Sequence, residues 1–80
     1  METPDGRTRR AELARQATRA RILDESRRVL SAGDVFDLTV QVLATELDLS
    51  RVTIYQYFPT TKDILKALSD ETIALIFSNL

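Results

Sequence analysis

Residues 40–59 of the chain read VQVLATELDLSRVTIYQYFP, and the order of apolar, small and hydroxyl residues in this stretch predicts two short helices joined by a tight turn. Two apolar stripes run through it at helical spacing, the first made by Leu43, Ala44 and Leu47 and the second by Leu49, Ile54 and Phe58. Such a pair of helices is typical of a helix-turn-helix motif, whose second helix reads DNA.

Single residues mark where these two helices begin and end. Asp48 belongs to the few residue types other than glycine that adopt the left-handed backbone conformation, so we expect the turn there. Ser50 is a good N-cap for the second helix, and Pro59 ends that helix. Ala44 is the small residue where two steeply crossing helices approach each other. The motif is therefore predicted to span residues 39–58.

The composition restricts the class of protein. A chain of 80 residues with 44% hydrophobic residues forms one small globular domain. It has no cysteine and no histidine, so thiolate metal sites and the commonest acid-base catalyst are excluded. Neighbouring acids such as Asp24 and Glu25 do not face each other on a helix. We therefore predict no enzyme, with no catalytic residue, no metal site and no cofactor.

The sequence also lacks membrane and export signals. No run of apolar residues approaches the roughly 20 that a membrane-spanning helix needs. The polar start METPDGRTRR lacks the apolar centre of a signal peptide. We therefore expect no membrane partner and a cytoplasmic location.

Charge is distributed unevenly along the chain, although the formal net charge is only −1. Residues 1–28 hold eight arginines and five acids, a net charge of +3, whereas residues 29–80 hold three cations and seven acids, a net charge of −4. The N-terminal arginines are suited to lie along a DNA backbone. The alternative is an arginine-rich helix face that only contacts solvent.

The N-terminal half is predicted to form one helix from Thr8 toward Ser31. Residues 1–17 form an arginine-rich arm that we expect to be flexible or frayed, because their apolar stripe is too narrow to bury much surface. Residues 18–80 form the helix-turn-helix domain. The predicted fold class is all-α, a small helical bundle with a homeodomain-like three-helix core and the start of a fourth helix.

Signals on both sides of the motif complete this prediction. Val35, Phe36 and Leu38 are expected to pack at the edge of the core. Thr60 and Asp63 have the spacing of a capping box that opens the fourth helix. That helix carries more apolar residues than a small domain covers, namely Ile64, Leu65, Leu68, Ile73, Leu75, Ile76 and Phe77. Such a surface usually contacts a partner, so we expect an N-terminal module of a longer protein or a chain paired with another.

The run from Ile22 to Leu68 resembles the N-terminal domain of TetR-type bacterial transcription repressors. The resemblance rests on Val40, Leu43-Ala44, Leu49-Ser50, Thr53-Ile54-Tyr55 and Tyr57-Phe58. It implies four helices, a palindromic operator on double-stranded DNA, and a homodimer built by a separate C-terminal ligand-binding domain. Such a domain does not fit in 80 residues, so we expect it to be absent here and the homodimer to form in a longer parent protein.

Four features depart from the family pattern. Asp48 stands where the family usually has glycine, and Val52 replaces a small residue or proline. Thr61 occupies the place of a lysine that often contacts phosphate, and Lys62 follows one position later. The loop from Gly33 to Thr39 is one residue longer than usual. These departures affect individual contacts more than the fold.

Placing Ile54 inward and stepping about 100° per residue assigns the sides of the second helix. Val52 and Gln56 then point outward, with Thr53 and Tyr55 at the flanks. The candidates for contacts to bases are Gln41, Arg51, Val52 and Tyr55, of which Gln41 matches a family position that often contacts a base. The candidates for contacts to phosphates are Thr39, Ser50, Thr53, Tyr57 and Lys62.

Three of the phosphate candidates also have a purely structural interpretation. Thr39 and Ser50 are suited to capping helices, and Tyr57 is suited to packing. The sequence thus predicts sequence-specific binding of double-stranded DNA by the reader domain of a transcription regulator, a repressor. The alternative is a helical protein–protein interaction module that does not bind DNA, which acids around the motif would favour.

Overall fold

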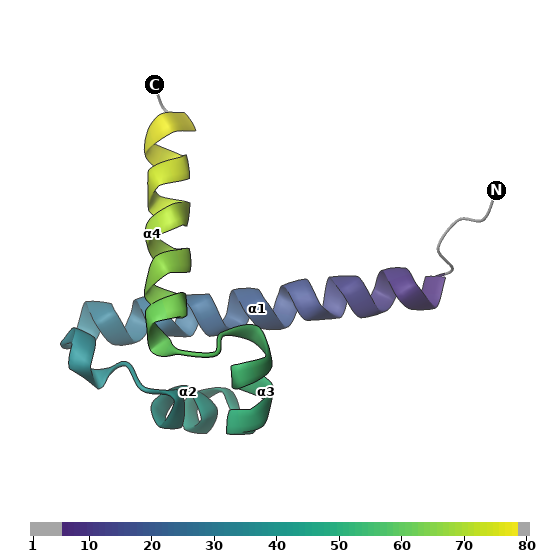
Figure 1. Cartoon of the computed structure of the whole chain (residues 1–80), viewed down its shortest axis with the longest axis horizontal. Coiled ribbons are helices and arrows are strands. Elements are labelled where there is room, and N and C mark those ends of the chain that lie inside the picture. Colours follow the sequence, from purple (N-terminus) through teal and green to yellow (C-terminus); the bar gives the residue numbers. More distant parts are fainter. Residues whose placement is uncertain (1–5, 79–80) are drawn as a thin grey trace.

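The computed structural model describes residues 6–78, which form four α-helices and a short 3-10 helix and contain no strand (Figure 1). The elements are α1 (Gly6–Ala32), η1 (Val35–Asp37), α2 (Val40–Leu47), α3 (Arg51–Tyr57) and α4 (Thr61–Ser78). This confirms the predicted all-α fold class and the helix-turn-helix at the predicted place.

The long helix α1 organises the other elements. In Figure 1, α2 and α3 lie together on one side of α1, and α4 leaves toward the other side. Contacts join α1 to both α2 and α4, and α2 to α3. The first half of α1 extends past α3 without a neighbouring element (Figure 1).

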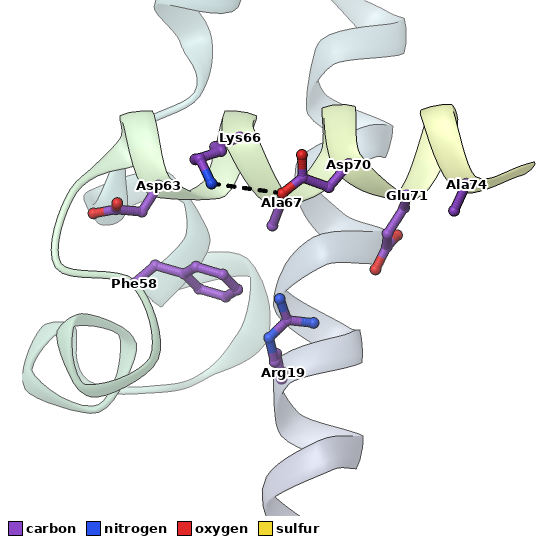
Figure 2. A pocket seen from close by; sticks show the side chains of 8 residues that line it. All are labelled: Arg19, Phe58, Asp63, Lys66, Ala67, Asp70, Glu71 and Ala74. Atoms are coloured by element: carbon purple, nitrogen blue, oxygen red, sulfur yellow. Dashed lines mark ion pairs between the residues drawn. The ribbon is translucent and has the colours of Figure 1, made fainter.

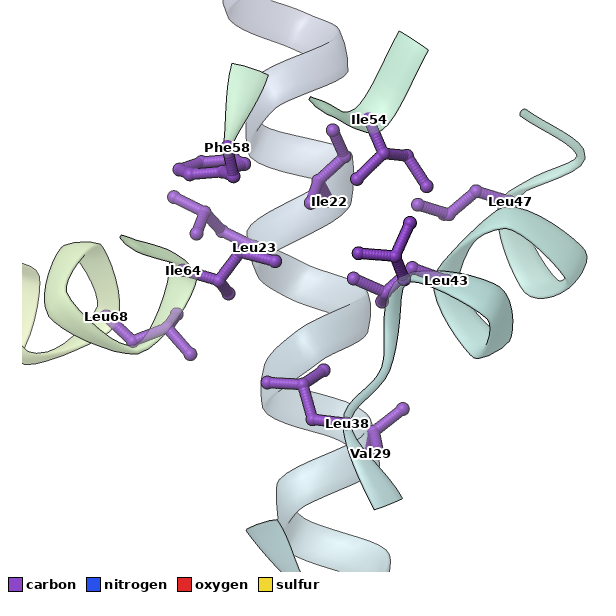
Figure 3. Packing of buried hydrophobic residues seen from close by; sticks show 11 residues of the cluster. Ile22, Leu23, Val29, Leu38, Leu43, Leu47, Ile54, Phe58, Ile64 and Leu68 are labelled. Carbon is purple, nitrogen blue, oxygen red and sulfur yellow. The ribbon is translucent and has the colours of Figure 1, made fainter. Parts of the chain in front are cut away.

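One hydrophobic core joins all four helices (Figure 3). Its largest fully buried apolar side chains are Ile22, Leu23, Leu43, Ile54 and Ile64. The buried Ser26 hydroxyl donates a hydrogen bond of 2.7 Å to the Ile22 carbonyl oxygen, so this polar group is satisfied inside its own helix. The predicted stripes of α2 and α3 thus pack against the C-terminal half of α1.

The ends of α2 and α3 have the predicted caps. The Thr39 hydroxyl accepts a hydrogen bond of 3.1 Å from the Val42 amide at the start of α2. Asp48 ends α2 with φ 56° and ψ 45°, the left-handed conformation expected of it. The Ser50 hydroxyl accepts a bond of 3.0 Å from the Thr53 amide at the start of α3. These caps fix how α3 leaves α2.

The predicted capping box at the start of α4 is also present. The Asp63 carboxylate accepts from the Thr60 amide at 3.1 Å, and the Thr60 hydroxyl accepts from the Asp63 amide at 3.2 Å. Ile64 and Leu68 are buried and anchor the first half of α4 in the core. Beyond Glu71 the side chains of α4 are exposed as far as Ser78.

The prediction for the loop before α2 was partly wrong. Leu38 is buried, but Val35 is exposed and the side chain of Phe36 is 86% exposed. Asp34 and Asp37 form a capping box across η1, in which the Asp37 carboxylate accepts from the Asp34 amide at 2.8 Å. We attribute the error to this turn, because it leaves Val35 and Phe36 outside the core.

The start of α1 also differs from the prediction. The helix begins at Gly6 rather than Thr8 and runs without interruption to Ala32. Residues 6–17 are exposed, including Leu13. The frayed or flexible arm stays a prediction, because a helical segment that buries nothing is only marginally stable. Residues 1–5 of the predicted arm lie outside the described residues.

Candidate nucleic-acid interface

The outward face of α3 carries three of the four candidates for base contacts. Ile54 and Phe58 are buried in the core, so the opposite side of this short helix faces away from the domain. Val52 is 67% exposed and Tyr55 is 48% exposed, and Arg51 is exposed in the first turn. A long cation, an apolar side chain and a phenol are therefore presented together on one anchored helix.

The fourth candidate, Gln41, lies in the first turn of α2 and is exposed. Its side-chain amide nitrogen donates to the Thr45 hydroxyl at 3.5 Å, which is at the long limit for a hydrogen bond. The amide is therefore only weakly held in its present position.

Two hydroxyl candidates combine capping with an exposed position, and the third, Thr53, is half-buried. Thr39 and Ser50 each accept a bond from a helix amide, as described above, and are exposed. The Ser50 and Thr53 hydroxyls also share a hydrogen bond of 2.8 Å. Because this bond uses one of their two protons, the pair has one O–H left to donate to a phosphate oxygen.

The last two candidates differ in exposure. Tyr57 is half-buried and its side chain packs against the core, which supports its structural interpretation. Lys62 is exposed in the first turn of α4, immediately after the loop that follows α3. Among residues 6–78, no ion pair involves Lys62 or Arg51, so both cations are available to an anion.

The acids of the motif are partly neutralised from α1. The Arg28 guanidinium contacts Glu46 of α2 at 3.4 Å and also bonds to Glu25, with Nε 2.8 Å from the carboxylate. The hydrogen bond from Arg28 holds the pKa of the Glu25 carboxyl below its usual value, and the same bond raises the pKa of Arg28. Asp48 has no such cation partner within residues 6–78.

Sequence reasoning missed that several arginines of α1 hold the bundle together. Arg21 donates to the Leu47 carbonyl oxygen at 3.1 Å, at the C-terminal end of α2. Arg27 pairs with Asp24 at 2.6 Å and with Glu71 of α4. Leu47 and Glu71 lie far from these arginines in sequence, so periodicity gives no signal for the contacts to α2 and α4, whereas Asp24 is only three residues from Arg27. The arginines that reach α2 and α4 therefore contribute to the fold, and contact of the N-terminal arginines with DNA stays a prediction.

An open hollow of about 390 Å³ lies between α1 and α4 and meets α3 only at its capping residue Phe58 (Figure 2). The Arg19 guanidinium lies over the Phe58 ring, 5.3 Å from its centre. Charged side chains form much of the remaining lining, among them Lys66 and Asp70, which are paired at 3.8 Å. A hollow this open and this charged differs from the mostly apolar, enclosed pockets that hold small ligands.

Neither a metal site nor a membrane-spanning helix is present within the described residues. No cluster of acidic, histidine or cysteine side chains in residues 6–78 has the arrangement of a metal site. None of the helices described here combines the length and the apolar character that crossing a bilayer requires.

Comparison with protein families gives one match. The family model described as bacterial regulatory proteins of the tetR family matches residues 22–68, which is more than half of the chain and includes the whole motif. No curated protein and no solved structure matches the chain.

Proposed function

The chain belongs to the tetR family of bacterial regulatory proteins, and from this we propose that it binds double-stranded DNA sequence-specifically as the reader domain of a transcription repressor. The observation that carries the proposal is the face of α3 that presents Arg51, Val52 and Tyr55. The opposite face of this helix is fixed by Ile54 and Phe58 in the core. A rigid helix with exposed side chains at its N-terminal end suits the major groove.

The residue types suggest separate roles at the base edges. Arg51 is suited to donate two hydrogen bonds to O6 and N7 of guanine. Val52 is suited to contact the methyl group of thymine, and Tyr55 to reach a base or a phosphate. Gln41 is suited to the N6 and N7 atoms of adenine, which an amide side chain contacts with one donor and one acceptor.

The remaining candidates are proposed to bind phosphate oxygens and so to fix the position of α3 on the duplex. Thr39 and the hydroxyl pair of Ser50 and Thr53 lie at the N-terminal ends of α2 and α3, where backbone amides also favour anions. Lys62 supplies a charge at the start of α4. Tyr57 adds a phenol that its packing holds in place.

We further propose that the functional form is a homodimer in a longer protein and that it acts in the cytoplasm. Two copies of α3 would then read half-sites about 34 Å apart. Support comes from the exposed apolar residues on the second half of α4, which are Ile73, Leu75, Ile76 and Phe77.

The test begins with selection of preferred sites from random duplexes, followed by titration of fluorescent duplexes at several salt concentrations. We expect Arg51→Ala to cost about 1–3 kcal/mol on the preferred site and to relax its sequence preference. Lys62→Ala should weaken binding to all sequences alike and lower the salt slope by about one. Lys66→Ala is the control, because Lys66 has the same charge on the same helix but pairs with Asp70.

A chain that retains no duplex at low salt, alone or within a longer parent, would contradict the proposal. The exposed apolar face of α4 would then favour the alternative function, a helical module that binds another protein.

A further inference from the structure

The first half of α1 is a charged helical projection that the fold does not use. Residues 6–17 are exposed, and they extend past α3 without packing against another element (Figure 1). They hold four arginines and one glutamate, a net charge of +3. Among these arginines, Arg15 pairs with Glu12 at 2.6 Å on the same helix.

The contacts of the second half of α1 identify which side of the helix faces which neighbour. Arg21 and Arg28 both reach α2, at the Leu47 carbonyl and at Glu46. Arg27 reaches α4, at Glu71. The helix therefore has one stripe that faces α2 and another that faces α4.

These stripes can be followed back into the projecting half, because an α-helix turns about 100° per residue. Arg10 precedes Arg21 by eleven residues, or three turns and about 20°, so Arg10 lies on the α2 side. Arg9 precedes Arg27 by eighteen residues, or five turns at about 100° per residue, so Arg9 lies on the α4 side. Two neighbouring arginines thus occupy different sides of one exposed helix.

The α2 side is also the side on which DNA would lie. α2 and α3 both lie on this side of α1 (Figure 1), and the exposed face of α3 points away from the core. Packed helix axes are about 8–10 Å apart, and the major groove is about 8.5 Å deep. With α3 in the groove, α1 would therefore lie near the height of the phosphates at the groove edge.

We propose that the projecting half of α1 is a second contact to the DNA backbone, beside the helix-turn-helix, and that Arg10 binds a phosphate there. Arg7 precedes Arg10 by almost one turn and lies on the same side of the helix. Arg10 is about 16 Å along the axis from Arg21, so its phosphate belongs to DNA flanking the site that α3 reads. The inference rests on the proposed function, because it requires α3 in the major groove.

The test compares Arg10→Ala with Arg9→Ala in the full chain. Both variants lose one positive charge from an exposed helix, and alanine preserves helix propensity, so circular dichroism should show the same helicity. The probe is a fluorescein-labelled duplex of mixed sequence, about 30 base pairs or three helical turns long. We expect Arg10→Ala to reduce the slope of log K against log salt by about 0.9, and Arg9→Ala to leave the slope unchanged.

A second duplex, cut at the edge of the site that α3 covers, locates the contact. On this duplex the difference between Arg10→Ala and Arg9→Ala should disappear, because the flanking phosphates are missing. Equal slopes for both variants on the long duplex would overturn the inference.

The controls Arg51→Ala and Lys62→Ala separate this inference from the proposed function. If they weaken binding while Arg10→Ala does not change the slope, the motif binds DNA and only the contact from α1 is wrong. If the unchanged chain binds no duplex at any salt concentration, the proposed function fails, and this inference fails with it.

Discussion

Asp48 shows how one residue sets the geometry of the turn in the motif. Its backbone has φ 56°, and among the described residues it alone combines a positive φ with a side chain. Its backbone amide donates to the carbonyl oxygens of both Ala44 and Thr45. Any residue other than proline has this amide and retains both contacts. The Asp48 carboxylate has no hydrogen-bond or ion-pair partner among the described residues. The backbone conformation rather than the side chain therefore determines which residues fit here.

The variant Asp48→Gly should be neutral or stabilise the domain by up to about 1 kcal/mol, because glycine adopts positive φ without a steric cost. Asp48→Ala is the matched control and should destabilise by about 1–2 kcal/mol, because alanine has the Cβ atom that opposes this conformation. Thermal melts of the two variants measure these changes in stability. A loss of several degrees for Asp48→Gly would show that the carboxylate makes a bond that the structure lacks.

Arg21 is a second residue with a local effect, because it places a cation at the C-terminal end of α2. Removing it by Arg21→Ala should destabilise the domain by about 1 kcal/mol, since the Leu47 carbonyl loses a charged donor and α2 loses a favourable charge at its negative end.

Arg9→Ala serves as the control for Arg21→Ala in a chemical denaturation series. It lies on the same helix, has no hydrogen-bond or ion-pair partner among residues 6–78, and should change stability by less than about 0.5 kcal/mol. Equal effects of the two variants would mean that the bond from Arg21 contributes nothing.

At the scale of the elements, the position of α3 depends on how closely it packs against α2. Ala44 is half-buried and packs against the core, and its carbonyl oxygen accepts the Leu49 amide at 3.0 Å across the turn. Both helices are short, so each depends on tertiary packing for its stability. A larger side chain at position 44 therefore affects the reading helix as well as α2.

Ala44→Leu should destabilise the domain by about 1–3 kcal/mol through overpacking, and DNA binding should weaken with it. Thr45→Leu places the same leucine side chain at the next position, which is exposed, and should change stability by less than about 0.5 kcal/mol. The melting temperatures of both variants test these expected changes in stability. An unchanged melting temperature for Ala44→Leu would place Ala44 on the surface, against the structure.

For the whole molecule, ion pairs from α1 connect three helices around a small core. Arg28 contacts acids of α1 and α2, and Arg27 contacts acids of α1 and α4. Exposed pairs contribute little individually. Their carboxylates nevertheless make the stability of the domain depend on pH.

The hydrogen bond from Arg28 lowers the pKa of Glu25, and hydrogen bonds from Arg15 and Gln16 lower the pKa of Glu12. A lowered folded-state pKa adds stability above the unfolded pKa of about 4.3, and this stability is lost as the pH falls through the folded value. The melting temperature should therefore fall below about pH 4.5. It should stay nearly constant between about pH 6 and 8, because the chain has no histidine to titrate there.

Melting curves of the chain and of Glu25→Gln across this pH range measure the effect. The variant should lose less of its stability on acidification than the unchanged chain does. A melting temperature that rises below about pH 4.5 would have the wrong sign for carboxylates of lowered pKa.

The sequence alone determined the helix-turn-helix and its boundaries. Caps, left-handed turns and apolar stripes are local properties, so Thr39, Asp48, Ser50 and the pair Thr60 and Asp63 predict helix ends that the structure confirms. The same periodicity predicted which side of α3 is exposed, and therefore where Arg51, Val52 and Tyr55 lie.

The tertiary structure decided what depends on contacts between residues distant in the chain. Periodicity does not show that Arg21 and Arg27 bind α2 and α4, because both arginines look like solvent-exposed residues of one helix. The sequence prediction also placed Val35 and Phe36 at the edge of the core beside Leu38, where the turn at η1 does not put them. The two sides of the first half of α1 became distinguishable only through these contacts, because a helix exposed all round has no apolar face to orient it.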